Sequence, residues 1–377
     1  MAANRARLTR IRSRLARRHA LRACGGLALL GVGGAGSALV AFWAASSLWR
    51  AVDDGVVLVA TSAAALLIAS FAAAVRCLTW LWAPGAQPEG VLLPREAAPA
   101  LHRTVDRVGR RFGSLAIDSV RVTGDMNASI LQRPRWGWIG PIETHLMIGL
   151  PLAHSVSARQ FSAILAHEFA HLASQRQGVA AWGSHIRGWW FRVVDRCIEE
   201  SPGFGPLLER WSAGELRDAL VLARLEEFEA DAIASQVVGA RLLGETIVEV
   251  ALKERFLSED YWRKVMAQSS HQPQPSIRPY RDMGLGMVTG FRRPASGLPH
   301  LVGRKTERSS SMSFHPSLAE RLRVLGVTPG LSSGRPASAA VSYLEPLLPA
   351  LAWVFDRAWW QEARPAWQQR YRGDRRD

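Results

Sequence analysis

The chain has 377 residues, and its 47 lysines and arginines against 32 aspartates and glutamates give a formal net charge of +15. That length allows one large catalytic domain with additional segments. The three cysteines, Cys24, Cys77 and Cys197, have neither the spacing of a disulfide framework nor that of a metal site, and a reducing compartment is permitted. Eight arginines and no acidic residue lie within residues 1–22, directly before a long apolar run. This pattern is typical of a cytoplasmic membrane flank, so it favours the lipid bilayer and disfavours nucleic acid as a partner.

Two uncharged segments follow, residues 23–49 and 55–75. Each is long enough to cross a hydrocarbon core of about 30 Å as a helix. Because only five residues, 50–54, connect them, we predict a transmembrane hairpin whose two ends emerge on the same side. A cleaved signal peptide is the alternative, but its apolar core is shorter and single. The arginines then predict a multi-pass protein of the cell (inner) membrane with a cytoplasmic catalytic domain.

The composition becomes that of a soluble domain after residue 84. Residues 96–112 predict an amphipathic helix. Two strand-like segments predict a small sheet: 119–130, which is broken by Gly124 and Asp125, and 144–150. An exposed edge of this sheet could accept a substrate peptide as a further strand; a plain hairpin covering the core is the alternative.

Residues 163–174 read AILAHEFAHLAS and place His167, Glu168 and His171 in the order H-E-x-x-H. Residues four apart share one helix face, so both imidazoles can reach one metal ion. Glu168 lies further round the helix, where it can act as general base on a water held at the metal. The alternative is a core helix that carries two histidines by chance. We predict one Zn²⁺ per chain on this helix, which should begin at a cap formed by Ser157.

Residues 182–196 combine tryptophans with interleaved arginines. The charges interrupt any apolar run long enough to span a membrane. A surface helix at the bilayer interface is one interpretation, and ordinary core packing is the other.

A third metal ligand should come from a later helix, and residues 216–238 predict one with a dense acidic cluster: Glu226, Glu227, Glu229 and Asp231. Glu227 and Asp231 share a face, so one can bind zinc while the other accepts a hydrogen bond from a ligating histidine. Glu229 points almost the opposite way. A solvated acidic face is the alternative, but such a face normally alternates with basic residues, and only Arg224 is near.

The motif HEFAH, followed 56 residues after its second histidine by Glu227-Phe228-Glu229-Ala230-Asp231, resembles the HtpX-like and CAAX-prenyl-protease-like family of membrane zinc metallopeptidases, which are gluzincins. The segment Phe314–Leu322, FHPSLAERL, is similar to the H-P-x-x-x-x-R segment of that family. The resemblance covers about residues 95–330. It implies that Glu227 is the third zinc ligand. It also implies that His315 and Arg321 lie by the cleft, as catalytic candidates that could stabilise an oxyanion.

The chain also departs from that family. Ala223 stands where members often carry serine before the arginine of the ligand helix. Two further spans expected for HtpX, and the several more of a prenyl-protein protease, are not found in the sequence. Residues 268–313, rich in Pro, Gly, Arg and Ser, predict an irregular loop or lid, and residues 343–367 a helical element that packs on the domain.

The expected fold is α+β, mainly α: an N-terminal transmembrane helical hairpin followed by a zincin-type metalloprotease domain with a small β-sheet. Its parts are a basic cytoplasmic arm (1–22), two transmembrane helices (23–83), the zinc metallopeptidase domain (84–330) and a C-terminal helical tail (331–377). The resemblance implies a membrane-anchored zinc endopeptidase that cleaves protein or peptide substrates in quality control. A non-proteolytic membrane chaperone or scaffold built on a zinc fold is the alternative.

Overall fold

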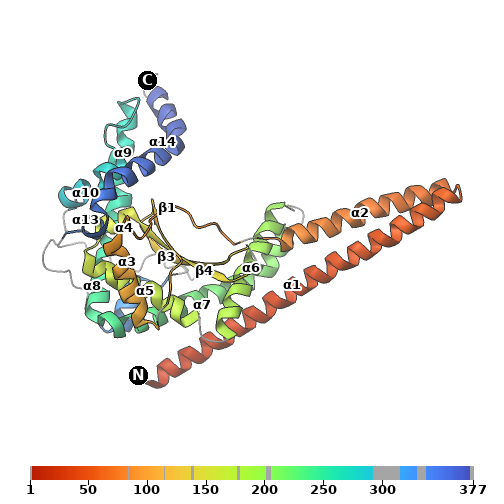
Figure 1. The fold of residues 1–377 in the computed structure, drawn as a ribbon, viewed down its shortest axis with the longest axis horizontal. Coiled ribbons are helices and arrows are strands. Elements are labelled where there is room, and N and C mark those ends of the chain that lie inside the picture. Colours follow the sequence, from red (N-terminus) through yellow and green to blue (C-terminus); the bar gives the residue numbers. More distant parts are fainter. Residues whose placement is uncertain are drawn as a thin grey trace. The chain divides into compact units, whose positions relative to one another are not determined.

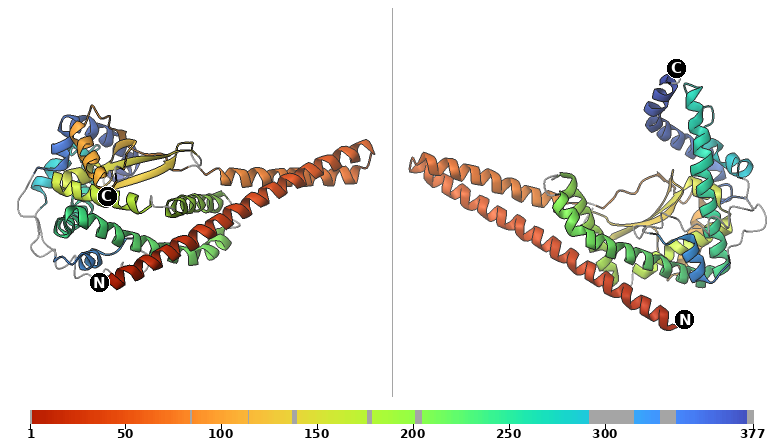
Figure 2. Two further views of the ribbon diagram at one scale, coloured as in Figure 1. Left: turned by 60° about the horizontal axis from the view of Figure 1, so that its bottom comes forward. Right: turned by 180° about the vertical axis from the view of Figure 1, so that it is seen from behind.

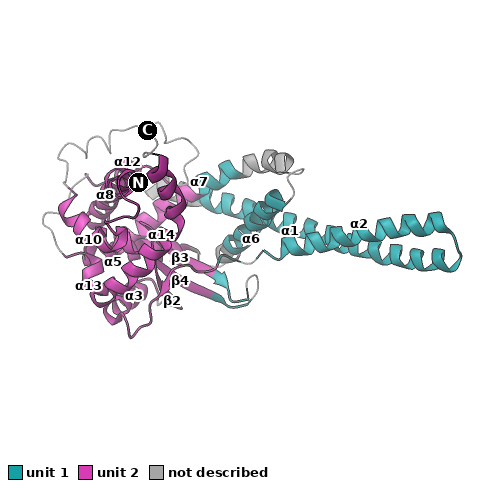
Figure 3. Ribbon diagram, turned by 90° about the horizontal axis from the view of Figure 1, so that it is seen from above, with its two compact units in different colours: residues 1–86, 133–142, 175–222 teal, residues 87–132, 143–174, 223–377 magenta. Residues whose placement is uncertain are grey.

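The computed structural model describes residues 2–83, 85–113, 115–136, 140–175, 179–200, 205–291, 315–328 and 337–373. Within them the chain is mainly helical and contains a four-stranded sheet (Figures 1 and 2). It divides into two compact units (Figure 3): residues 1–86, 133–142 and 175–222 form the first, and residues 87–132, 143–174 and 223–377 form the second. The expected mainly helical α+β fold is therefore confirmed.

The first unit is built on a hairpin of two long helices, α1 (Ala2–Asp53) and α2 (Val57–Leu81). Gly55, with φ +70°, lies in the turn between them. In the described part of the chain, residues 10–53 and α2 are long and apolar enough to cross a membrane. The basic residues of the predicted arm continue the first helix, and the second helix ends at Leu81, within the predicted range 23–83. The Arg76 guanidinium is 2.8 Å from a carboxylate oxygen of Glu200.

Helix α6 (Val179–Glu200) packs on both helices of the hairpin and bonds to the end of α2. The indole of Trp189 donates to the carbonyl of Leu81 at 3.0 Å, and the Arg196 guanidinium donates to the carbonyls of Thr79 and Trp82 at 3.2 and 2.9 Å. These acceptors belong to the last turn of α2 and the residue after it, where helix carbonyls lack intrahelical partners. These contacts thus account for Trp189 and Arg196 of this helix.

The second unit contains a sheet of β1 (Val91–Leu92), β2 (Ser119–Thr123), β3 (Ala128–Pro134) and β4 (Ile142–Gly149) in the order β1-β2-β4-β3. β2 pairs in parallel with β4, with Val120 opposite Leu146, and β1 is antiparallel to β2. The predicted strand-like segment 119–130, broken at Gly124 and Asp125, forms the two strands β2 and β3, because the chain turns between Thr123 and Ala128. β1 was not predicted. β3 lies at an edge of the sheet; its role in binding a peptide stays a prediction.

Two helices bury their apolar faces with this sheet in one core: α3 (Pro99–Arg111) and α5 (Ala158–Gln175). Phe161, Leu165 and Phe169 of α5 recur at intervals of four and are all at most 1% exposed. The ring of Phe169 stacks on Phe112 at 6.1 Å. Because this face of α5 is committed to the core, the opposite face is available to a functional site.

The remaining described elements of the second unit are helical. Helix α7 (Gly205–Val238) enters it at Ala223 and is followed by α8 (Ala240–Phe256), a π-helical turn (Leu257–Tyr261), α9 (Trp262–Ala267), a 3₁₀ turn (Gln268–Ser270), α10 (Pro279–Thr289), α12 (Leu318–Leu325), α13 (Ala339–Leu344), a second 3₁₀ turn (Glu345–Leu347) and α14 (Leu348–Gly373). Short helix α4 (Leu150–Ser155) joins β4 to α5.

Two predictions for this C-terminal half have different outcomes. The interpretation of 268–313 as one irregular loop is wrong for residues 279–289, which form α10 with Pro279 in its first turn, where proline is compatible with a helix. Residues 292–313 lie outside the described part, so the lid stays untested. The predicted helical element of the tail is present as α14, whose Trp367 is fully buried and donates to the carbonyl of Gln272 at 2.9 Å.

Candidate metal centre

Helix α5 carries the first half of the site. Ser157 and Gln160 form a reciprocal cap at its start: the Ser157 hydroxyl accepts from the amide of Gln160 at 3.3 Å, and the Gln160 side-chain oxygen accepts from the amide of Ser157 at 3.0 Å. This is the cap expected from the sequence. His167 and His171 follow one turn apart, and their Nε2 atoms are 3.2 Å from each other.

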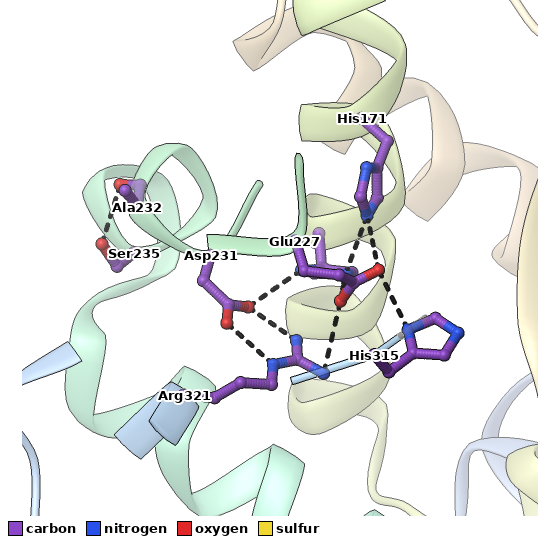
Figure 4. A network of polar contacts seen from close by, with 8 residues as sticks. His171, Glu227, Asp231, Ala232, Ser235, His315 and Arg321 are labelled. Carbon is purple, nitrogen blue, oxygen red and sulfur yellow. Dashed lines mark hydrogen bonds and ion pairs between the residues drawn. The ribbon is translucent and has the colours of Figure 1, made fainter. Parts of the chain in front are cut away.

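Helix α7 supplies the second half. The Glu227 carboxylate lies 3.6 Å from Nε2 of His167. It lies 3.4 Å from Nε2 of His171 (Figure 4). These three side chains are the group of potential metal ligands found among the described residues, with one ligand atom of each within 4.8 Å of the others. Glu229, one of the acidic residues considered from the sequence, is not part of the group. The structure therefore brings together the three side chains that we predicted as ligands.

The donor atoms fit a zinc ion in both spacing and chemistry. Ligands about 2.0–2.1 Å from zinc in a tetrahedral arrangement lie roughly 3.4 Å apart, and the three separations here are 3.2, 3.4 and 3.6 Å. Two imidazole nitrogens and one carboxylate are also a donor set that catalytic zinc uses, with one coordination position left for water or substrate. The residues thus have the identity and placement needed to hold the metal.

Asp231 orients one of the histidines. It is four residues after Glu227 on α7, is 0% exposed, and its Oδ1 is 3.1 Å from Nδ1 of His167. The opposite ring nitrogen of His167 faces His171 and Glu227, so a proton held toward Asp231 leaves the metal-facing lone pair available. Burial alone would lower the pKa of His167, but the contacts with Asp231 and Glu227 outweigh it and raise that pKa to about 9. The two carboxylates therefore favour a positive charge at this imidazole.

Arg321, on α12, is held by Asp231. Its Nε and Nη2 donate to the two carboxylate oxygens of Asp231 at 2.8 and 2.7 Å, and its Nη1 is 3.6 Å from Glu227 (Figure 4). Two of its nitrogens are thus engaged in fixing the carboxylate that contacts His167. A role for Arg321 in contacting an oxyanion stays a prediction, and the contacts that the structure shows are those of a residue that positions Asp231.

His315 reaches the site from the residues just before α12. Its Nδ1 is 3.3 Å from Oε1 of Glu227, and its side chain is 75% exposed. Contact with the Glu227 carboxylate raises the pKa of His315 despite its partial burial. Burial alone would raise the pKa of Glu227. The contacts of its carboxylate with His167, His171 and His315 outweigh burial and hold that pKa well below its ordinary range. An exposed imidazole beside the potential metal ligands can face a bound substrate.

The environment of Glu168 suits a general base. Burial raises the pKa of this carboxyl, while the nearby imidazoles of His167 and His171 act in the opposite direction. A carboxylate whose proton affinity is raised accepts a proton more readily near neutral pH. The structure therefore has a potential ligand set, an adjacent base and an exposed imidazole in one place.

The sequence did not single out the pair of Arg224 and Glu320. Arg224, three residues before Glu227, places its Nη2 2.8 Å from both carboxylate oxygens of Glu320 on α12. A signal was present: Ser317 and Glu320 have the S-x-x-E spacing of a capping box, which marks a helix start directly after His315-Pro316.

A helix that carries H-E-x-x-H, together with a second helix whose glutamate lies beside the two histidines, defines the class of HExxH metallohydrolases. Residues 143–328, which include all of these side chains, match the family model of peptidase family M48. No curated protein and no solved structure matches the chain. This segment is an M48 peptidase domain, in agreement with the resemblance seen in the sequence.

Proposed function

We propose that the chain is a membrane-anchored zinc endopeptidase that hydrolyses peptide bonds of protein substrates. The observation that carries the proposal is the convergence of His167, His171 and Glu227 beside Glu168. Membership of the domain in an M48 peptidase family supports the reaction class.

The proposed mechanism assigns one task to each side chain. When bound by His167, His171 and Glu227, zinc would polarise the scissile carbonyl and lower the pKa of a water molecule. Glu168 takes the proton of the attacking water and delivers it to the departing amine. His315, beside Glu227 and exposed, donates a hydrogen bond to the oxygen that gains negative charge in the transition state.

We further propose that the α1–α2 hairpin anchors the enzyme in the cell (inner) membrane, with the peptidase domain in the cytoplasm. The two long apolar helices and the arginines before the first of them support this placement. Such an anchor favours substrates that are themselves membrane proteins or lie near the bilayer, which suits a role in protein quality control.

Replacement of Glu168 by glutamine tests the reaction. The amide fills the same space but cannot accept the proton, so hydrolysis of an unstructured peptide should fall on the order of 100-fold or more while zinc content is unchanged. Asp106→Asn is a matched control, because Asp106 contacts Arg95 on the surface and is not one of the residues of the site. Near-normal turnover by the zinc-loaded Glu168→Gln protein would contradict the proposal and favour a scaffold.

A further inference from the structure

One face of α7 contacts α12 at two separate points. Arg224 and Asp231, seven residues apart, share the face that also carries Glu227. Asp231 binds Arg321, and Arg224 binds Glu320. The first of these ion pairs is directed at His167 through Asp231. In the second pair, Arg224 is three residues before Glu227. Among the described residues, this pair has no contact with a potential metal ligand.

The Arg224–Glu320 pair is tied to the start of α12. Glu320 is the third residue of the helix, and its carboxylate accepts from the amide of Ser317 at 2.8 Å and from the hydroxyl of Ser317 at 2.9 Å. The Ser317 hydroxyl in turn accepts from the amide of Glu320 at 3.3 Å. Arg224 therefore holds the same carboxylate that fixes the cap of α12.

His315 lies two residues before this cap, separated from it only by Pro316. Its side chain is 75% exposed, whereas that of His171 is 22% exposed, so packing restrains His315 much less. Its place beside Glu227 depends largely on where the backbone of Ser317 is held. Pro316 restricts the connecting backbone, so a displacement of the cap is transmitted to the histidine.

We propose that Arg224 is a positioning residue that fixes His315 beside Glu227 by anchoring Glu320 and the cap at Ser317. The proposal rests on the proposed function, because it assigns His315 a task in hydrolysis. It separates the two ion pairs: Arg321 and Asp231 serve the metal ligand His167, and Arg224 and Glu320 serve the residue that faces the substrate. Loss of Arg224 leaves α12 attached through Arg321, so the effect is confined to the start of the helix.

The test compares Arg224→Gln with Arg241→Gln in the full-length, zinc-loaded protein. Arg241 forms an ion pair with Glu245 at 2.9 Å on the exposed surface of α8, and its loss should leave kcat unchanged. Arg224→Gln should lower kcat on a peptide roughly tenfold through misplacement of His315, with KM and zinc content unchanged. In a His315→Ala background the same substitution should have no further effect, because residues that act in series are not additive.

A second readout does not depend on activity. In the metal-free protein, Arg224→Gln should accelerate hydrogen exchange of the backbone amides of residues 317–321 and leave those of residues 227–235 at the wild-type rate. Equal losses of kcat in the wild-type and His315→Ala backgrounds would overturn the proposal, as would unchanged exchange at 317–321. Failure of the proposed function is distinguishable, because hydrolysis by the wild-type protein would then not depend on Glu168.

Discussion

At the scale of single residues, one buried carboxylate connects the ligand set to the rest of the domain. Asp231 accepts hydrogen bonds from Nε and Nη2 of Arg321 and contacts Nδ1 of His167. Burial raises the pKa of Asp231, but the hydrogen bonds from Arg321 and His167 outweigh it and lower that pKa. The negative charge is therefore retained inside the domain, where it requires a partner.

Arg321→Met should expose the cost of leaving that charge without its partner. The Arg321 side chain is 17% exposed and that of Asp231 1%, so the pair is largely removed from water. Loss of the guanidinium should lower the free energy of unfolding by about 3–5 kcal/mol, measured by denaturant titration of the metal-free protein. Arg255→Met, which breaks the exposed pair with Glu259, should cost less than about 1 kcal/mol. Equal losses in the two variants would contradict this account.

The residues that meet in the candidate site were predictable to different degrees. Helical periodicity alone placed His167 with His171, and Glu227 with Asp231, on shared faces. It could not show that the two helices face each other, because that depends on packing between segments distant in sequence. It also left open which of the acids is the ligand, and the resemblance to a known family, not the spacing, pointed to Glu227. The bidentate contact of Arg321 with Asp231 was not foreseen.

At the scale of elements, α4 and α10 meet closely at a histidine. A Cβ atom built on Gly284 of α10 would lie 3.2 Å from the ring of His154 on α4, so the imidazole fills the space between the helices. Burial lowers the pKa of His154 to about 4. Since that pKa lies below the ordinary value of about 6.5, the neutral ring is the form compatible with the fold.

Acid should therefore weaken this helix contact. The contribution of His154 to stability is fully present above about pH 6.5 and is lost as the pH falls toward 4, to a total of up to about 3 kcal/mol. The difference in unfolding free energy between pH 6.5 and pH 4 should be smaller in His154→Gln than in the wild type. His271→Gln, at an exposed position, should behave as the wild type. A His154→Gln protein with the full wild-type pH dependence would refute this role.

The elements that the sequence failed to predict are those in which local pattern is weak. β1 has two residues and is defined only by its pairing with β2. The segment 119–130 showed its break at Gly124 and Asp125, but the local pattern could not show that the residues on either side of the break form separate strands, β2 and β3, that flank β4. α10 lies in a region whose composition indicates a loop, and it is held by contacts with distant elements: Asp356 on α14 accepts from the backbone amides of Tyr280 and Arg281.

At the scale of the whole molecule, the proposed function joins a membrane anchor to a cytoplasmic peptidase. The hairpin was predictable because a long run without charge has few alternatives in a folded chain. The structure adds that residues of the arginine-rich arm are helical, and that α6 engages the end of α2 through Arg196 and Trp189. Both features belong to the unit that contains the hairpin.

Fusion of a reporter after Asp377 tests the orientation. Lysine and arginine near a membrane are retained in the cytoplasm, and a hairpin returns the chain to the side from which it started. A reporter that is active only in the cytoplasm should therefore be active in the fusion. Replacement of Arg5, Arg7, Arg10 and Arg12 by glutamine should weaken the preference for a cytoplasmic N-terminus and so lower the reporter activity. A silent reporter in the presence of full-length fusion protein would contradict both the hairpin and the cytoplasmic placement.

The most direct test of the central claim is the metal content of the purified full-length protein, measured for the wild type, Glu227→Ala and Glu229→Ala. The wild type and Glu229→Ala should each hold one zinc per chain, and Glu227→Ala should lose it, because only Glu227 of these two acids lies with both Nε2 atoms. The thermal transition of Glu227→Ala shows whether the variant is folded, and a folded variant excludes unfolding as the cause of the zinc loss. A Glu227→Ala protein that keeps its zinc, or a Glu229→Ala protein that loses it, would contradict the account.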